Sequence, residues 1–439
     1  MRMQPRRHAA AGAAACALIM LPHEAAWTQV AADAPGALST PAPATPPPPS
    51  SDWLARWTDP SSAPFIPIPE IDTDPQTGTT LGLIAVVLRV NARGEIARIL
   101  APDLFKSQYF GWGARMRIYD YPSEDTQWSV VGGAKQRVER EFDALYTTGL
   151  TRREPLSWSV ETVYDRSGTA RFFGIGNESL FANETTYVNN QGDVSAMIGR
   201  NFTPALQLAY VARLRVVDVL PGVLPGIPSI ETVYPGLKGI GSEHALENTV
   251  MLTFDTRDST VMPQSGARYV VYGGLANSAL ASSVSYSYVG AEARYYWPLT
   301  HDTTFAWHAA VRYMPSAADA PFWALSSLGG DRSVTGEREP LRSNGDDRYL
   351  DRDLFATGVE LRARVAGFDA FGTRVSLEVA PFVDTGKVFG SAGTSPVSQL
   401  HAAAGFGVRG VASPYVVGYV DFGFSHGRSA VFSGINYPF

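Results

Sequence analysis

Two stretches late in the chain decide the fold: RDLFATGVELRARVA at residues 352–366 and TRVSLEVAPFVDTGKV at residues 373–388. Apolar and polar side chains alternate in both, as where Val359 and Leu361 flank Glu360. A period of two predicts β-strands with one apolar and one polar face. The polar face carries full charges of both signs here, which suits the watery lumen of a membrane barrel better than a packed core.

The same alternation recurs along most of the chain. It predicts sixteen strands, at approximately residues 78–90, 94–101, 107–120, 126–141, 155–165, 185–199, 204–218, 247–258, 265–277, 283–297, 303–314, 352–366, 373–388, 399–411, 415–425 and 430–439. An even number of strands, joined by short turns and longer loops, is typical of bacterial outer-membrane barrels. Closing such a sheet leaves no backbone edge unpaired in lipid. The sequence therefore predicts an all-β, antiparallel transmembrane barrel, integral to the bacterial outer membrane.

The composition changes twice ahead of the predicted barrel. Residues 1–32 combine arginines with the apolar stretch Ala9–Leu21 and small residues for cleavage, which is typical of a secretory signal peptide. Cys16, the only cysteine, would leave with this peptide; a lipoprotein anchor at the same cysteine is the alternative. Residues 33–77 are rich in proline and predict a periplasmic tether and lead-in. Residues 78–439 form the predicted barrel domain.

Composition and motifs argue against several functional classes. With 36 basic against 42 acidic residues, the chain lacks the excess positive charge that nucleic-acid binding uses. GFGVRG at residues 405–410 lies inside a predicted strand, where a dinucleotide fingerprint has no context. The four aspartates between Asp346 and Asp353 match no standard calcium loop. We therefore expect no enzyme, no cofactor and no metal.

Three segments resemble the bacterial surface antigen family of outer-membrane barrels, the BamA/TamA-like group. LTFDTRDSTVMPQSGARYVVYGG at residues 252–274 is similar to a strand–turn–strand unit of that family, and PFVDTGKVF at residues 381–389 to its Phe-x-Asp-x-Gly strand. VFSGINYPF, with Ile435, Tyr437 and Phe439, resembles the C-terminal signal of outer-membrane barrels. The resemblance covers roughly residues 78–439. It implies a translocation or insertion barrel that lacks the N-terminal periplasmic modules of the family.

The resemblance also implies a role for the long polar loop at residues 315–351. Its LGG and VTG sequences, with Gly329, Gly330 and Gly336, lie where the family has a motif in a loop that folds into the lumen. On this comparison the loop plugs the barrel between strands eleven and twelve, and Asp384 lies on strand thirteen.

One part of that loop departs from the family pattern. Thr335 stands where the family has an arginine that pairs with the aspartate matched by Asp384, and Glu337 stands where it has an aromatic residue. A buried carboxylate without a partner is costly, so Asp384 needs another cation. The candidates are Arg332, Arg338 and Arg342 of the loop and Arg362 of the neighbouring strand, which also carries Glu360. Arg332 is the favoured partner.

The resemblance implies that the protein handles polypeptide or lipid at the outer membrane, through the lumen or through the seam between its first and last strands. Pro438 lacks an N–H for a closing ladder and would weaken a seam with the first strand near Thr80–Val90; alternatively, it lies beyond the ladder. Expected partners are outer-membrane lipids and lipopolysaccharide, the barrel-assembly machinery during biogenesis, and a separate periplasmic or client polypeptide. The alternative function is a passive or plugged pore, or a structural anchor, with no client.

Overall fold

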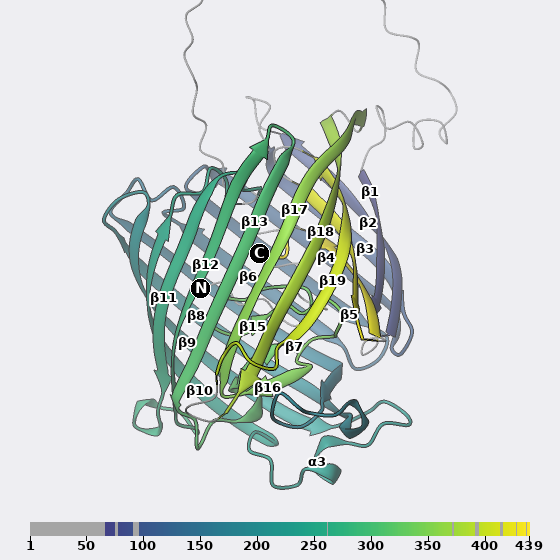
Figure 1. Ribbon diagram of the computed structural model, residues 1–439, viewed down its shortest axis with the longest axis vertical. Helices are drawn as coiled ribbons and strands as arrows, with labels where there is room; N and C mark the ends of the chain where they lie inside the picture. The colour runs from purple at the N-terminus through teal and green to yellow at the C-terminus, as the bar shows by residue number, and fades with distance from the viewer. Residues whose placement is uncertain are drawn as a thin grey trace, which may run out of the picture.

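The computed structural model describes residues 66–74, 78–90, 96–260, 262–370, 373–390, 395–412, 416–426, 428–435 and 437–439. The expected signal peptide and the part of the lead-in before Ile66 lie outside these residues. The described residues form one main sheet of eighteen strands (Figure 1). Its strands are β1 (Ile66–Asp74), β2 (Gly78–Val90), β3 (Ile96–Ser107), β4 (Gly111–Ser123), β5 (Thr126–Lys135), β6 (Arg140–Thr148), β7 (Leu156–Phe172), β8 (Thr185–Asn201), β9 (Leu206–Pro221), β10 (Gly241–Asp255), β11 (Gly266–Ala276), β12 (Tyr286–Thr300), β13 (Thr303–Ser316), β17 (Asp353–Ala370), β18 (Thr373–Phe389), β19 (His401–Ala412), β20 (Val416–Ser425) and β21 (Arg428–Ile435).

The sheet returns on itself. Each strand pairs antiparallel with the next along the chain, and β13 pairs directly with β17. The circle is completed between β1 and β21, where Thr73 lies opposite Val431. Long loops, one with the short helix α3 (Ile230–Val233), gather at the lower end of the barrel in Figure 1, and short turns such as residues 301–302 at the other. The expected antiparallel barrel is confirmed.

The wall turns its charges inward and its apolar side chains outward. Along β9, Arg213 and Arg215 are buried while Leu214 and Val216 are exposed. The pattern of β17 is the same, with Glu360 buried and Leu361 exposed. An exposed apolar wall around charged interior positions is the arrangement of a barrel surrounded by lipid. Within the described residues, no helix is long and apolar enough to cross a membrane.

The wall has eighteen strands where the sequence pattern predicted sixteen. β1 is one addition, since it arises from residues expected to form only a lead-in. Pro67 and Pro69 lie two residues apart, so their missing N–H groups fall on the same side of β1. A strand at a seam tolerates this because few ladder bonds are required there. The other is β6, because the predicted segment 126–141 covers β5 and only the first two residues of β6.

The loop between β13 and β17 folds into the barrel, as predicted. It carries the 3-10 helix η3 (Phe322–Ala324) and a small sheet of β14 (Ser326–Leu328), β15 (Arg338–Glu339) and β16 (Tyr349–Asp351). We call residues 317–352 the plug. Because two more strands precede it than expected, the plug follows the thirteenth wall strand rather than the eleventh, and Asp384 lies on the fifteenth rather than the thirteenth.

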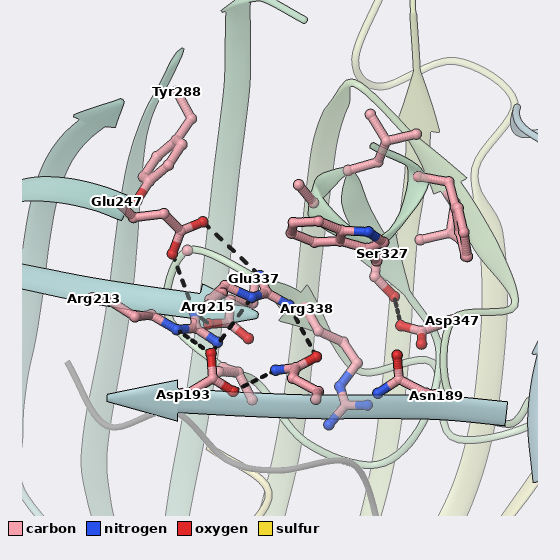
Figure 2. A pocket seen from close by; sticks show the side chains of 18 of the residues that line it. Asn189, Asp193, Arg213, Arg215, Glu247, Tyr288, Ser327, Glu337, Arg338 and Asp347 are labelled. Atoms are coloured by element: carbon pink, nitrogen blue, oxygen red, sulfur yellow. Dashed lines mark hydrogen bonds and ion pairs between the residues drawn. The ribbon is translucent and has the colours of Figure 1, made fainter. Parts of the chain in front are cut away.

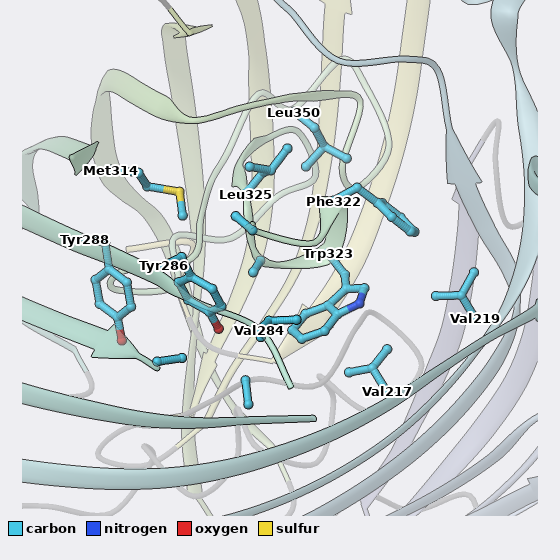
Figure 3. Packing of buried hydrophobic residues seen from close by; sticks show 14 of the residues in the cluster. Val217, Val219, Val284, Tyr286, Tyr288, Met314, Phe322, Trp323, Leu325 and Leu350 are labelled. Atoms are coloured by element: carbon cyan, nitrogen blue, oxygen red, sulfur yellow. The ribbon is translucent and has the colours of Figure 1, made fainter. Parts of the chain in front are cut away.

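An apolar cluster holds residues near both ends of the plug sequence against the wall (Figure 3). Phe322, Trp323 and Leu350 of the plug pack with wall residues that include Tyr187 and Val217. The ring of Phe322 meets the ring of Tyr187 edge-on, with centroids 5.3 Å apart. Each buried apolar side chain of this size contributes about 1.5–3 kcal/mol relative to an exposed one, so this cluster favours the plugged state.

Candidate functional site in the lumen

Arg342 of the plug binds Asp384 of β18 through both ends of its guanidinium group. Nε donates to Oδ2 and Nη2 donates to Oδ1, each at 2.7 Å. The backbone N–H of Arg342 donates to the same carboxylate at 3.2 Å. Both side chains are completely buried. A two-pronged arginine–carboxylate pair fixes orientation as well as distance, so this contact sets the position of the plug relative to the wall.

Further charges surround this pair. Arg342 Nη1 lies 2.5 Å from Glu360 Oε1 and 2.9 Å from Asp421 Oδ2, and the guanidinium lies 3.4 Å from the ring centroid of Phe382. Arg409 donates to Glu360 at 2.9 Å. Burial alone would lower the pKa of Arg342, but the carboxylates, Asp384 first among them, raise it well above its usual value. Such a cluster is stable only while every charge keeps its partners.

The favoured pairing of Arg332 with Asp384 is therefore wrong. Arg332 Nη2 instead donates to the hydroxyl of Tyr419 at 2.9 Å. The other candidates also lie elsewhere: Arg338 pairs with Asp346 and Arg362 with Glu360, at 2.7 Å and 3.0 Å. Thr335, which stands in the place of the family arginine, donates its hydroxyl to the carboxylate of Glu292 on β12.

Two glycines allow the plug to pack closely. Gly329 has φ of +143°, and a Cβ there would lie 2.3 Å from the carbonyl oxygen of Gly345. On the wall, a Cβ at Gly423 of β20 would lie 1.8 Å from the carbonyl oxygen of Arg342. The predicted motif glycines Gly330 and Gly336 also have positive φ. The motif thus shapes the plug, whereas Gly423 makes room for it.

A second polar contact region lies between the plug and β8–β10 (Figure 2). Arg213 donates to Glu337 of the plug at 2.5 Å and to Asp193 at 3.1 Å. Burial would raise the pKa of Glu337, but Arg213 and then Arg215 lower it below the usual value. The region lines a partly open cavity of about 80 Å³, enough for several water molecules. Glu337, which stands where the family has an aromatic residue, is thus an ionic contact.

The segment expected to end the last strand leaves the wall. β21 ends at Ile435, whose side chain lies outside the described residues, and Tyr437, Pro438 and Phe439 turn into the lumen. Tyr437 donates to Glu378 at 2.9 Å, and Phe439 is buried beside Tyr296. The prediction of a strand reaching Phe439 is wrong, and the alternative for Pro438, a position beyond the ladder, is correct.

Asp421 and Arg409 belong to the cluster but were not predicted as site residues. Both alternate with apolar neighbours on their strands, as Asp421 does between Val420 and Phe422, so the strand pattern places them on the luminal face. Their pairing with the plug could not be predicted, because it depends on the path of the loop, and a loop has no sequence period. Within the described part of the chain, no group of three or more His, Cys, Asp or Glu side chains is placed to hold a metal ion.

Comparison with known proteins agrees with this architecture. Residues 127–425, more than half of the chain, match the model of the Omp85 superfamily domain. BamA from Haemophilus ducreyi lacking POTRA domains 1–3 has a similar fold, with a TM-score of 0.50 and 12% identity over 84% of this chain and 74% of that one. CdiB from Escherichia coli is also similar, with a TM-score of 0.53 and 11% identity over 85% and 67% of the two chains. No curated protein sequence matches the chain. The chain belongs to the Omp85 superfamily, a family of outer-membrane transport and insertion proteins, and is an integral β-barrel of the outer membrane.

Proposed function

We propose that this barrel handles polypeptide at the outer membrane by opening its wall between β1 and β21, while the plug keeps the lumen closed. The cargo is an unfolded or strand-forming polypeptide, and its route is the seam between these two strands. The expected alternative cargo, lipid, has no comparable support, since the exposed groups of a strand edge recognise backbone amides.

The weak pairing of β1 with β21 carries the proposal. Among the residues that the structure describes, these strands share one registered pair, Thr73 with Val431, whereas β1 and β2 share nine. β1 also carries Pro67 and Pro69, and β21 ends at Ile435 as the chain turns inward. A strand edge with unpaired backbone groups is a template for another strand. This seam is therefore the part of the wall best suited to receive a client.

The plug supports the proposal in a second way. It is fixed by the Arg342–Asp384 pair and by Arg213 with Glu337, and these contacts join it to β18 and β9. Neither contact involves β1. The seam can therefore open while the plug stays in place, which would preserve the permeability barrier during handling of a client.

The second candidate function is a plugged pore or structural anchor with no client. The filled lumen favours it over an open pore, because residues 322–350 are largely buried inside the barrel. Conductance in planar bilayers separates an open pore from a plugged barrel. A large steady current in the intact protein would favour the pore, whereas a plugged barrel conducts only after the plug is removed.

Locking the seam with a disulfide tests the proposed function. Thr73→Cys with Val431→Cys joins β1 to β21 at their registered pair. Val130→Cys with Ala144→Cys places a matched disulfide between β5 and β6, away from the seam. We expect the seam disulfide to reproduce the phenotype of a deletion strain, and reduction to restore function. The β5–β6 disulfide should have no effect. Normal function with a fully locked seam would exclude the proposed gating and favour the structural anchor.

A further inference from the structure

The segment Tyr437–Phe439 lies in a cleft on the luminal wall, which β19 and β20 separate from β21, the strand that precedes the segment. Figure 1 marks this end of the chain within the outline of the barrel. The cleft is formed by Tyr296, His308, Arg362 and Glu378, which come from the adjacent strands β12, β13, β17 and β18 and are all at most 3% exposed. The segment therefore crosses from β21 to a surface to which it is not joined in sequence.

The first half of the cleft holds a tyrosine. The ring of Tyr437 lies under the guanidinium of Arg362, whose central carbon is 3.8 Å from the ring centroid. The central carbon of the Arg409 guanidinium lies 5.0 Å from the same centroid. The hydroxyl donates to Glu378 at 2.9 Å. Stacking selects an aromatic ring, and the carboxylate selects a ring with a donor at its tip.

The second half holds a phenylalanine. Phe439 is 4% exposed and packs with Tyr296 and Ala306. Its ring centroid lies 4.1 Å from that of His308. Two residues apart on an extended segment, Tyr437 and Phe439 can enter pockets on the same surface.

The cleft also binds backbone. Arg362 Nη2 donates to the main-chain oxygen of Phe439 at 3.2 Å, and the N–H of Ser333 in the plug donates to the carbonyl oxygen of Pro438 at 3.1 Å. Two side-chain pockets combined with donors to the intervening backbone are the elements of a peptide-binding site.

The present occupant does not satisfy every polar group of the cleft. The Tyr296 hydroxyl and Arg362 Nη1 are buried and have no hydrogen-bond partner among the residues that the structure describes. Tyr296 is 1% and Arg362 2% exposed. Buried donors without acceptors are costly, so both atoms offer bonds to a peptide that brings further carbonyl or carboxylate oxygens.

We propose that this cleft is a binding site for an extended peptide of the pattern aromatic-x-aromatic, with tyrosine before phenylalanine, and that residues 437–439 occupy it as an intramolecular ligand. Binding in trans then requires the chain's own segment to leave. The site lies on the wall strands β12, β13, β17 and β18 and not at the seam, so it does not depend on whether the seam opens.

Peptide binding to a barrel with a vacated cleft tests this proposal. The double variant Tyr437→Ala, Phe439→Ala removes both rings of the resident segment. A fluorescein-labelled peptide of the sequence SGINYPF, taken from residues 433–439, is titrated in detergent and followed by fluorescence anisotropy. We expect it to bind the double variant at least about ten-fold more tightly than the wild-type barrel, since the wild-type cleft is filled.

Two controls locate the binding. Adding His308→Ala to the double variant should weaken binding of the peptide by about ten-fold, because it removes one wall of the phenylalanine pocket. The peptide SGINAPA should not compete. Heat-dependent gel migration and circular dichroism establish that each barrel is folded; if the double variant does not assemble, Phe439→Ala alone vacates half of the cleft. Equal binding to wild type and variant, or no binding to a folded vacated barrel, would overturn the proposal.

Discussion

Arg342 Nε and Nη2 each lie 2.7 Å from an oxygen of Asp384, and this pair joins the plug to wall strand β18. The same guanidinium reaches Glu360 and Asp421 on β17 and β20. One residue of the loop thus contacts three strands of the wall. Removing Arg342 would leave several buried carboxylates with fewer cations.

Substituting Arg342 by alanine should release the plug. Loss of one partner from a buried ionic cluster costs about 3–5 kcal/mol. We expect the plug to become accessible to protease within the folded barrel, and single-channel conductance to rise. Arg332→Ala is the matched control from the same loop, because Arg332 contacts Tyr419 rather than Asp384. Equal plug release by both variants would contradict the assignment of Arg342 as the anchor.

Adding a methyl group to the wall at Gly423 should displace the plug. Its Cβ would lie 1.8 Å from the carbonyl oxygen of Arg342, and overpacking of this kind costs about 1–3 kcal/mol. Gly423→Ala should therefore expose the plug to protease although it alters no charge. Gly418→Ala lies on the same strand, where a Cβ has nothing within 4 Å, and should behave as wild type. Identical proteolysis of the two variants would show that the plug does not approach β20 so closely.

Acid should weaken the contact between Glu337 and Arg213. Because Arg213 holds the pKa of Glu337 below the usual 4.5, this contact stabilises the plugged state fully above pH 4.5 and is lost as the pH falls through the lowered pKa. Plug protection against an acid-active protease should decline in that range. In Glu337→Gln the decline should be smaller, and protection at neutral pH should already be reduced. The same pH dependence in wild type and variant would exclude Glu337 as a contributor.

Period-two alternation predicted most of the wall, because luminal charges such as Glu360 alternate with lipid-facing apolar residues such as Leu361. The boundaries of β2 were predicted correctly on this basis. The hairpin of β5 and β6 was missed because its turn at residues 136–139 contains neither glycine nor proline. Val138 adopts φ of +57° there, a conformation that a β-branched residue takes only where the surrounding structure imposes it.

The site was less predictable than the wall. Asp384 and Glu360 could be placed in the lumen, since their strands fix which way they face. The partner of Asp384 could not be chosen among four arginines, because a loop has no period to relate its residues to the wall. The inward turn of Tyr437 and Phe439 was missed for a related reason. Alternation continues through Ile435 and Tyr437 in the sequence, while the contacts that draw Tyr437 inward come from distant strands.

Amide hydrogen exchange measures the weakness of the seam directly, in the unmodified protein. If the wall opens between β1 and β21, the amides of residues 66–74 and 428–435 should exchange much faster than those of β5 and β6, by about ten-fold or more. The disulfide formed by Thr73→Cys and Val431→Cys should slow this exchange, whereas the β5–β6 disulfide should not. Protection of β1 and β21 equal to that of β5 and β6 would contradict opening at this seam.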